Sequence, residues 1–138
     1  MNITLKRMND AVHFEGTSNT TDVKVHIDGS PDIGGESLGS RPMELVLMAL
    51  GSCSALDLVS ILKKQRQGVD DFQVDVSGKR REEIPNIFTH IHINFRLSGN
   101  IDVAKAEKAA ELAVKKYCSV HDMLEAGGVE ITYGLEIS

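Results

Sequence analysis

The sequence predicts a single α+β domain, and three observations carry this prediction. The chain has 138 residues, which is the length of one ordinary domain. Its predicted strands come in groups separated by helices, rather than alternating one by one with helices as in a parallel α/β sheet. Charged residues make up 25% of the chain and apolar residues 41%, which is enough apolar material for a folded core. No internal repeat is apparent, so residues 1–138 are predicted to form one domain.

Three short strands are predicted in the first third of the chain. Residues 3–8 and 22–28 alternate apolar and polar side chains, and residues 11–15 follow a turn at Asn9 and Asp10. Strict alternation of this kind is typical of half-buried strands. The glycine- and serine-rich segment 29–40 is predicted to be a loop.

A long helix is predicted from an N-cap at Ser40 to about Gln67, with Gly68 ending it. Glu44 lies in the first turn, where a negative charge complements the positive end of the helix. Residues 45–50 are apolar on every side, so we expect this helix to be buried all round. A chain of this size has difficulty surrounding such a helix, which indicates a partner chain.

The second half of the chain is predicted to contain three strands and two helices. Alternation predicts strands at 72–77, 87–97 and 129–137, and an amphipathic pattern predicts a helix over 102–117. A short helical turn is predicted over 119–126. The side chains expected on one face of the middle strand are Ile87, Ile91, Ile93, Phe95 and Leu97.

Charge and composition exclude several function classes. Fifteen Lys and Arg against twenty Asp and Glu give a net charge of 15 − 20 = −5, aromatic residues are 4%, and Trp is absent. A nucleic-acid-binding surface needs basic and stacking residues, so we expect no nucleic acid among the partners. The apolar stretch 45–56 is shorter than the roughly 20 residues that cross a bilayer. We therefore expect a cytoplasmic protein that binds no membrane and needs no cofactor.

Two cysteines are the candidates for chemistry. Cys53 lies among small residues in Gly51-Ser52-Cys53-Ser54-Ala55, which leaves its thiol sterically open, and Cys118 follows the second long helix. If the two thiols meet, they can act as a nucleophile and a resolving thiol. The alternative is that both are core residues, which is a common fate of free cysteine.

A reactive Cys53 would need help to ionise. At an ordinary pKa near 8.5, only about 3% of a thiol is ionised at pH 7. Cys53 is more than two turns from the start of its own helix, and Asp57 is predicted on the same face, where its charge opposes a thiolate. A cationic partner is therefore expected. The candidates are Arg7, Arg41, His121 and the cluster 79–81.

A zinc site is a further alternative. Cys53-x3-Asp57 and Cys118-x2-His121 are two half-sites with permissive ligand spacing. No GxSxG, GxGxxG or P-loop motif is present.

Several motifs in this chain resemble the OsmC/Ohr family, which comprises osmotically inducible protein C and the organic hydroperoxide resistance proteins. One is the run Arg41-Pro42-Met43-Glu44-Leu45-Val46-Leu47 followed by Gly51-Ser52-Cys53. Further motifs resemble the OsmC-like branch of this family, namely Arg80-Arg81-Glu82-Glu83, Pro85, Phe88-Thr89-His90-Ile91 and Lys116-Tyr117-Cys118-Ser119-Val120.

The resemblance implies antiparallel sheets around a long buried central helix, in an intertwined homodimer. It also implies a thiol peroxidase that reduces organic hydroperoxides. In this scheme Cys53 becomes a sulfenic acid, Cys118 condenses with it to a disulfide, and an external dithiol, usually of the lipoyl type, resets the pair.

The family pattern also suggests supporting roles for Glu44 and Arg7. Met43 stands where well-characterised peroxidases of the family carry Glu. Glu44 is nine residues before Cys53, and at about 100° per residue it falls on the opposite face of a straight helix. The alternative function is a non-catalytic dimer that binds a small apolar ligand or a thiol partner, with peroxidase activity lost because of Met43.

Overall fold

The computed structural model describes all 138 residues and confirms the α+β class. Two three-stranded sheets and three α-helices form two compact units, residues 1–46 and 47–138, which are described in turn. In chain order the elements are β1 (Ile3–Arg7), β2 (Phe14–Ser18), β3 (Thr21–Ile27), the 3₁₀ turn η1 (Pro31–Ile33), α1 (Pro42–Lys64), β4 (Gly68–Arg80), β5 (Phe88–Asn100), α2 (Val103–Leu112), the π-helical turn η2 (Ala113–Tyr117), α3 (Ser119–Ala126) and β6 (Glu130–Ile137).

The first unit is an antiparallel sheet in the order β1-β2-β3. Leu5 lies opposite Gly16, which lies opposite Val25. The apolar side chains of this sheet are open to solvent, because Ile3, Leu5, Val23 and Val25 are 46–70% exposed. The prediction that β1 and β3 are half-buried is therefore wrong for the single chain, in which the alternating pattern leaves an apolar face uncovered.

The loop that follows β3 is anchored by a buried carboxylate. Asp28 accepts hydrogen bonds from the backbone N–H groups of Glu36 (2.9 Å), Leu38 (3.1 Å) and Gly29 (2.8 Å). These donors, Glu36 first, hold the pKa of Asp28 below its ordinary value. The segment predicted as a loop thus has a defined course up to the start of α1.

Both ends of α1 differ from the prediction. The helix begins at Pro42, and Arg41 precedes it, with its N–H donating to the Glu44 carboxylate (3.4 Å). Ser40 pairs with Ile27 in a β-bridge instead of capping the helix. The helix ends at Lys64 because Arg66 adopts a left-handed conformation (φ 55°). The N–H of Gln67 then reaches the carbonyl of Leu62 (3.0 Å), as in a Schellman C-cap.

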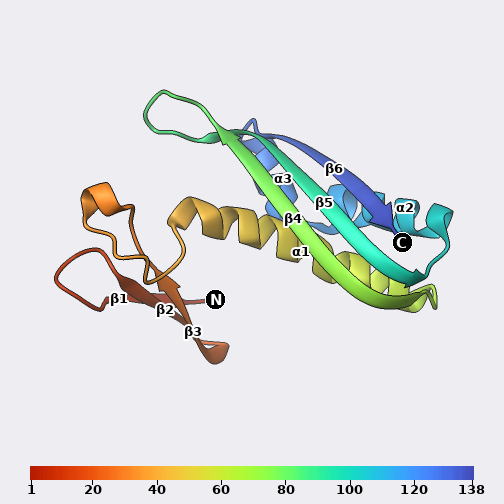
Figure 1. Cartoon of the computed structure of the whole chain (residues 1–138), viewed down its shortest axis with the longest axis horizontal. Helices are drawn as coiled ribbons and strands as arrows, with labels where there is room; N and C mark the ends of the chain where they lie inside the picture. The colour runs from red at the N-terminus through yellow and green to blue at the C-terminus, as the bar shows by residue number, and fades with distance from the viewer. The chain divides into compact units, whose positions relative to one another are not determined.

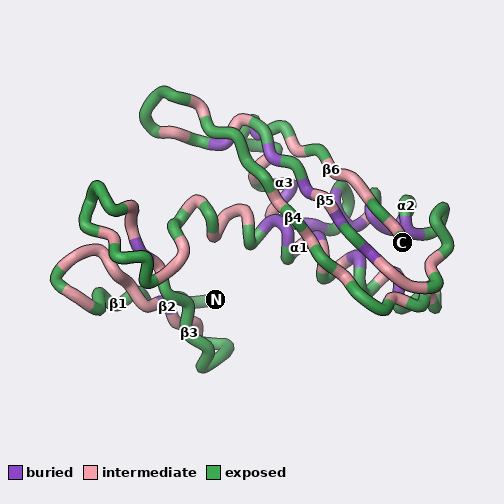
Figure 2. Tube along the Cα trace, viewed as in Figure 1, coloured by how far each residue is buried: buried purple, intermediate pink, exposed green.

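Only one face of α1 is buried in the single chain. Leu50, Leu58 and Leu62 are fully buried, whereas Leu56 is 73% exposed and Met48 52%. Buried and exposed residues both occur along α1 (Figure 2). The prediction of burial all round is therefore wrong for one chain. By length and composition α1 is also apolar enough to cross a membrane, a test that the core helix of a soluble protein passes as well. Here the leucines of α1 contribute to the core of the second unit.

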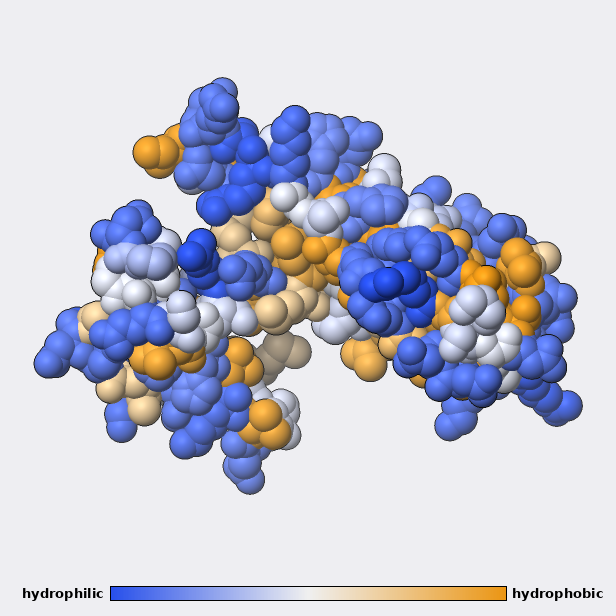
Figure 3. All heavy atoms as spheres, in the orientation of Figure 1, coloured by the Kyte–Doolittle hydropathy of each residue, from blue (hydrophilic) through white to orange (hydrophobic).

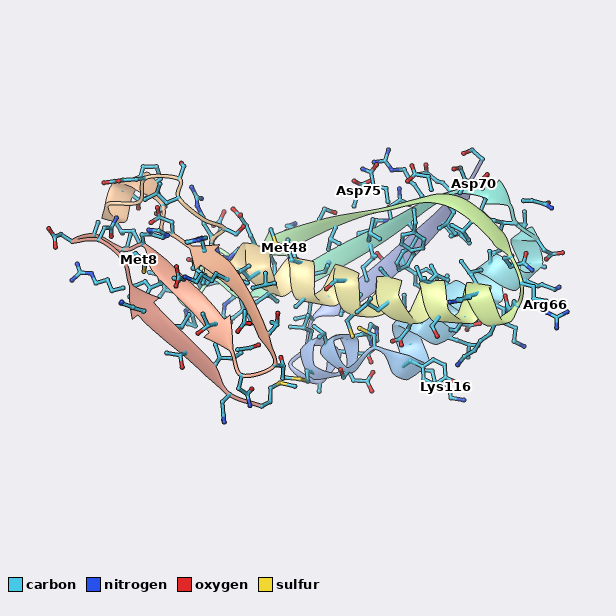
Figure 4. All side chains as sticks on the ribbon, turned by 90° about the horizontal axis from the view of Figure 1, so that it is seen from below. Met8, Met48, Arg66, Asp70, Asp75 and Lys116 are labelled. Carbon is cyan, nitrogen blue, oxygen red and sulfur yellow. The ribbon has the colours of Figure 1, made fainter.

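The second sheet has the order β4-β5-β6, and α1, α2 and α3 lie on one of its faces (Figures 1 and 4). β4 and β5 are antiparallel, as expected, but β6 runs parallel to β5. The prediction of antiparallel sheets is thus wrong for this pair. The reason is the connection: α2, η2 and α3 form a helical crossover, which returns the chain to the end of the sheet where β5 began.

Strand β5 supplies much of the core. Ile91, Ile93, Phe95 and Leu97 are buried on one face, as predicted. Ile87 is 41% exposed, and Phe88 is buried in its place. The reason is a β-bulge: Lys79 pairs with His90, but the next residue of β4, Arg80, pairs with Phe88. One extra residue of β5 lies between these pairs, so the residues of β5 that come before it face the opposite side of the sheet from the one that strict alternation predicts.

The other face of the second sheet is polar. Asp70 and Asp75 lie on the side of β4 away from the helices (Figure 4), and hydrophilic side chains gather over the middle of this face (Figure 3). Exposed polar pairs cross it, including the Arg96 guanidinium with the Asp75 carboxylate (2.6 Å) and His90 Nε2 with a Glu130 carboxylate oxygen (2.9 Å). Exposed pairs of this kind contribute little to stability, so this is a solvated face.

Gly51 allows α1 to lie close to β4. A methyl group on Gly51 would stand 2.6 Å from Cγ2 of Val76, a stiff side chain. We expect Gly51→Ala to lower the free energy of unfolding by about 1–2 kcal/mol, because overpacking outweighs the roughly 1 kcal/mol that alanine gains in helix propensity. Urea unfolding measures the change, with Ser52→Ala at the exposed neighbour as control. A Gly51→Ala variant as stable as wild type would contradict this packing.

Candidate active site

The structure brings the two cysteines together within the second unit. Cys53 is partly exposed in the middle of α1, and Cys118 is buried, with 1% of its surface accessible. Each of the two thiols shifts the pKa of the other, so their side chains are neighbours. Cys118 Sγ also lies 4.0 Å from the carbonyl oxygen of Leu50, one turn before Cys53. The alternative in which both thiols pack in the core without meeting is therefore wrong.

Cys118 follows a segment in which the α-helix changes to a π-helical turn. Asp102 caps α2 by accepting from the Lys105 N–H (2.9 Å), and the helix widens into the π-helical turn η2 before Tyr117. Cys118 itself is extended (φ −73°, ψ 103°), and its sulfur accepts from the His121 N–H at 3.3 Å. Cys118 is thus the N-cap of α3, a position that a side-chain acceptor satisfies.

The first turn of α3 faces Cys53. The sulfur of Cys53 is approached by the backbone N–H groups of Val120 and Ser119 and by the Ser119 hydroxyl, whose oxygen lies 4.0 Å away. Burial raises the pKa of Cys53. The Val120 N–H, the Cys118 thiol and the two Ser119 groups together outweigh it, so the pKa lies below its ordinary value. A helix N-terminus favours an anion in this way.

Cys118 is shifted in the opposite direction. Burial is the largest cause, and it raises the pKa of Cys118. The Cys53 sulfur raises this pKa further, while the Ser54 hydroxyl and the His121 N–H lower it and only partly compensate. Ser54 is itself fully buried, and its hydroxyl makes no hydrogen bond of normal geometry. The pair therefore ionises first at Cys53, the thiol that solvent reaches.

The groups that lower the pKa of Cys53 include no cation. Neutral donors at the start of α3 lower this pKa in the single chain, and a cationic partner for Cys53 stays a prediction. The Arg7 guanidinium is hydrogen-bonded to the backbone carbonyls of Asp10 and Ala11 in its own loop. The Glu44 carboxylate accepts from the Arg41 N–H, and α1 continues without a break past Gly51. Supporting roles for Arg7 and Glu44 remain predictions.

The structure does not assemble the zinc ligands considered above. The side chains whose ligand atoms gather within 4.8 Å are His121, Asp122 and Glu125, all on α3. Neither cysteine belongs to this group. His121 is buried and its Nδ1 lies 3.3 Å from the Asp122 carboxylate, while Asp122 and Glu125 are exposed. A shell of Cys53, Asp57, Cys118 and His121 is therefore absent.

Ser119 and Val120 are the site residues that sequence reasoning missed. The signal for a helix start was present, because residues 119–126 are predicted as a helical turn that begins directly after Cys118. What the sequence did not show is that this start meets Cys53, since the contact joins residues 66 positions apart.

Comparison with known proteins identifies the family of this chain. Residues 34–134 match the family described as OsmC-like protein. Protein YhfA of Escherichia coli K12 is 50% identical over 97 residues, which are 70% of this chain and 72% of that protein. The crystal structure of a hypothetical protein from Aquifex aeolicus VF5 has a TM-score of 0.84 at 32% identity, covering 99% of this chain and 95% of that one.

A more distant structure shares the fold. The organic hydroperoxide resistance protein OhrB of Bacillus subtilis has a TM-score of 0.61 at 21% identity, covering 99% of this chain and 96% of its own. The family match spans most of the chain and is supported by the identity with YhfA. This protein therefore belongs to the OsmC-like family.

Proposed function

We propose that this protein is a thiol-dependent peroxidase that reduces organic hydroperoxides. The observation that carries the proposal is the paired arrangement of Cys53 and Cys118 at the start of α3. There the accessible thiol has a lowered pKa and the buried thiol a raised one. Relatives of the same fold that are named organic hydroperoxide resistance proteins support this choice of substrate.

The reaction proceeds in three steps. The Cys53 thiolate attacks the terminal oxygen of the hydroperoxide, the O–O bond breaks, and the alkoxide takes a proton and leaves as an alcohol. Cys53 is then a sulfenic acid. The Cys118 thiolate attacks the sulfur of Cys53, and water leaves as the disulfide forms. An external dithiol reduces the disulfide, so each turnover oxidises one dithiol and reduces one hydroperoxide.

The charge state of Cys53 controls when Cys118 ionises, and this sets the sequence of the steps. While Cys53 is a thiolate, its charge and hydrogen bond keep the pKa of Cys118 high. Conversion of Cys53 to a neutral sulfenic acid removes both effects, so the pKa of Cys118 falls when a resolving thiolate is needed. The His121 N–H already points at the Cys118 sulfur and stabilises the new charge.

The assembly and the reductant belong to the same proposal. We infer a homodimer because one face of α1 and the apolar face of the first sheet are uncovered in the single chain. Residues such as Leu56 and Val59 would be buried by a second copy. A dithiol of the lipoyl type is the proposed reductant, in keeping with a reducing cytoplasmic setting.

Intact-mass and peptide mass spectrometry tests the proposal. The reduced protein receives one equivalent of cumene hydroperoxide, and the expected product has lost two hydrogens and contains a Cys53–Cys118 peptide link. Hydrogen peroxide at the same concentration serves as the comparison oxidant. Unchanged thiols, together with a Cys53 pKa at or above its ordinary value, would contradict the proposal. That result would favour the alternative of a non-catalytic dimer that binds an apolar ligand or a thiol partner.

A further inference from the structure

Ser119 has a hydroxyl beside the Cys53 sulfur that helps to lower the pKa of Cys53 but takes no part in the three reaction steps above. Its hydroxyl oxygen lies 4.0 Å from Cys53 Sγ and has no other hydrogen-bond partner in the chain. Ser119 is exposed, whereas Cys118 directly before it is buried. The extended backbone of Cys118 thus sends one side chain into the core and the next to the open side of the site.

The position of the Ser119 hydroxyl is suited to contact with a hydroperoxide bound at Cys53. The backbone N–H groups of Val120 and Ser119 already lower the pKa of Cys53. A nucleophile approaches its target atom from about 3–3.5 Å, and a proton donor must come within about 2.6–3.2 Å of the oxygen that receives the proton. A hydroxyl 4.0 Å from the sulfur, on the solvent side, is placed to reach an oxygen of a hydroperoxide that the sulfur attacks.

We propose that Ser119 is a catalytic residue whose hydroxyl donates a hydrogen bond to the leaving oxygen of the hydroperoxide. The inference rests on the proposed peroxidase function. The electron pair of the Cys53 thiolate forms the S–O bond, and the pair of the O–O bond moves to the alkoxy oxygen. That oxygen takes a proton through the Ser119 hydroxyl, which regains one from water. The products are the sulfenic acid, an alcohol and hydroxide, so atoms and charge balance.

Reaction rates with two electrophiles distinguish proton donation by Ser119 from a change in the reactivity of the Cys53 thiolate itself. Cumene hydroperoxide releases an alkoxide that needs a proton, whereas iodoacetamide releases iodide, which needs none. Single-turnover rates of Cys53 with both reagents are measured for wild type, Ser119→Ala and Ser119→Thr across a pH series that extends above the pKa of Cys53. At the high-pH plateau every variant is fully ionised at Cys53, so differences there report on the chemical step.

We expect the plateau rate of Ser119→Ala with hydroperoxide to fall about 100-fold, the lower end of the range for loss of a proton donor. Its plateau rate with iodoacetamide stays within about twofold of wild type. Ser119→Thr keeps the hydroxyl and restores most of the hydroperoxide rate. Ser52→Ala is the matched control, because Ser52 is an exposed hydroxyl next to Cys53 that bonds the Ala49 carbonyl (3.3 Å) instead. It leaves both rates unchanged.

Three results would overturn the role of Ser119: a hydroperoxide plateau in Ser119→Ala equal to wild type, equal losses with both reagents, or no rescue by threonine. Failure of the underlying function looks different. In that case wild-type Cys53 reacts with iodoacetamide but gives no sulfenic acid or disulfide with hydroperoxide.

Discussion

Cys53→Ser abolishes hydroperoxide turnover, with an expected loss of at least about a thousandfold. A serine hydroxyl does not ionise near neutral pH, so the donors on Val120 and Ser119 have no anion to stabilise and no nucleophile is left. Steady-state reduction of cumene hydroperoxide with dihydrolipoamide measures the effect. The fold tolerates the change, because sulfur is replaced by oxygen at a partly exposed position.

The control for this variant is Ser52→Ala, which alters the neighbouring residue on α1 without touching either thiol. It keeps wild-type turnover. Equal rates of hydroperoxide reduction for wild type and Cys53→Ser would contradict the peroxidase proposal. The measured loss of hydroperoxide would then occur at another residue or without the protein.

Cys118→Ala stops the cycle after its first step. The hydroperoxide still oxidises Cys53, but no resolving thiol is present, so Cys53 remains a sulfenic acid that a dimedone probe captures. Turnover with a dithiol is expected to fall about 10–100-fold, limited by direct attack of the external thiol on the sulfenic acid. Wild-type turnover in Cys118→Ala would show that Cys118 does not resolve the intermediate.

The same variant has a second, independent effect on the pH dependence. The Cys118 side chain lowers the pKa of Cys53, so its removal raises the pKa of Cys53. The thiolate fraction grows as pH rises through this pKa. The pH profile of Cys53 alkylation therefore moves to higher pH in Cys118→Ala. Conversely, the pKa of Cys118 falls in Cys53→Ser, because the thiolate that raised it is gone.

Much of the fold followed from local patterns. The alternation on β5 identified Ile91, Ile93, Phe95 and Leu97 as one buried face, and the amphipathic run after Asp102 identified a helix. Such patterns are readable because the repeat of side chains along an element is fixed by its backbone geometry. They failed where a non-local feature intervened. Because of the β-bulge near Arg80, Phe88 is buried instead of Ile87, and the helical crossover makes β6 parallel to β5.

Burial was predictable only in part. The apolar residues of α1 and of the first sheet suggested elements covered on all sides, whereas the single chain leaves Leu56 and Val23 more than two thirds exposed. A sequence shows that a surface is apolar, but it does not show which surface covers it. That information is held by the assembly, and the exposed faces are what support a second copy.

The sequence by itself determined the α+β class and the two long helical segments, and it supplied the two cysteines of the proposed site, because these depend on residue type and spacing. Only the tertiary structure showed what lowers the pKa of Cys53. The start of α3 lies against a cysteine in the middle of α1, so the N–H groups of Val120 and Ser119 lower the pKa of Cys53. The physical reason is that a pKa depends on the donors and the burial around a group. Here those donors come from residues 66 and 67 positions further along the chain.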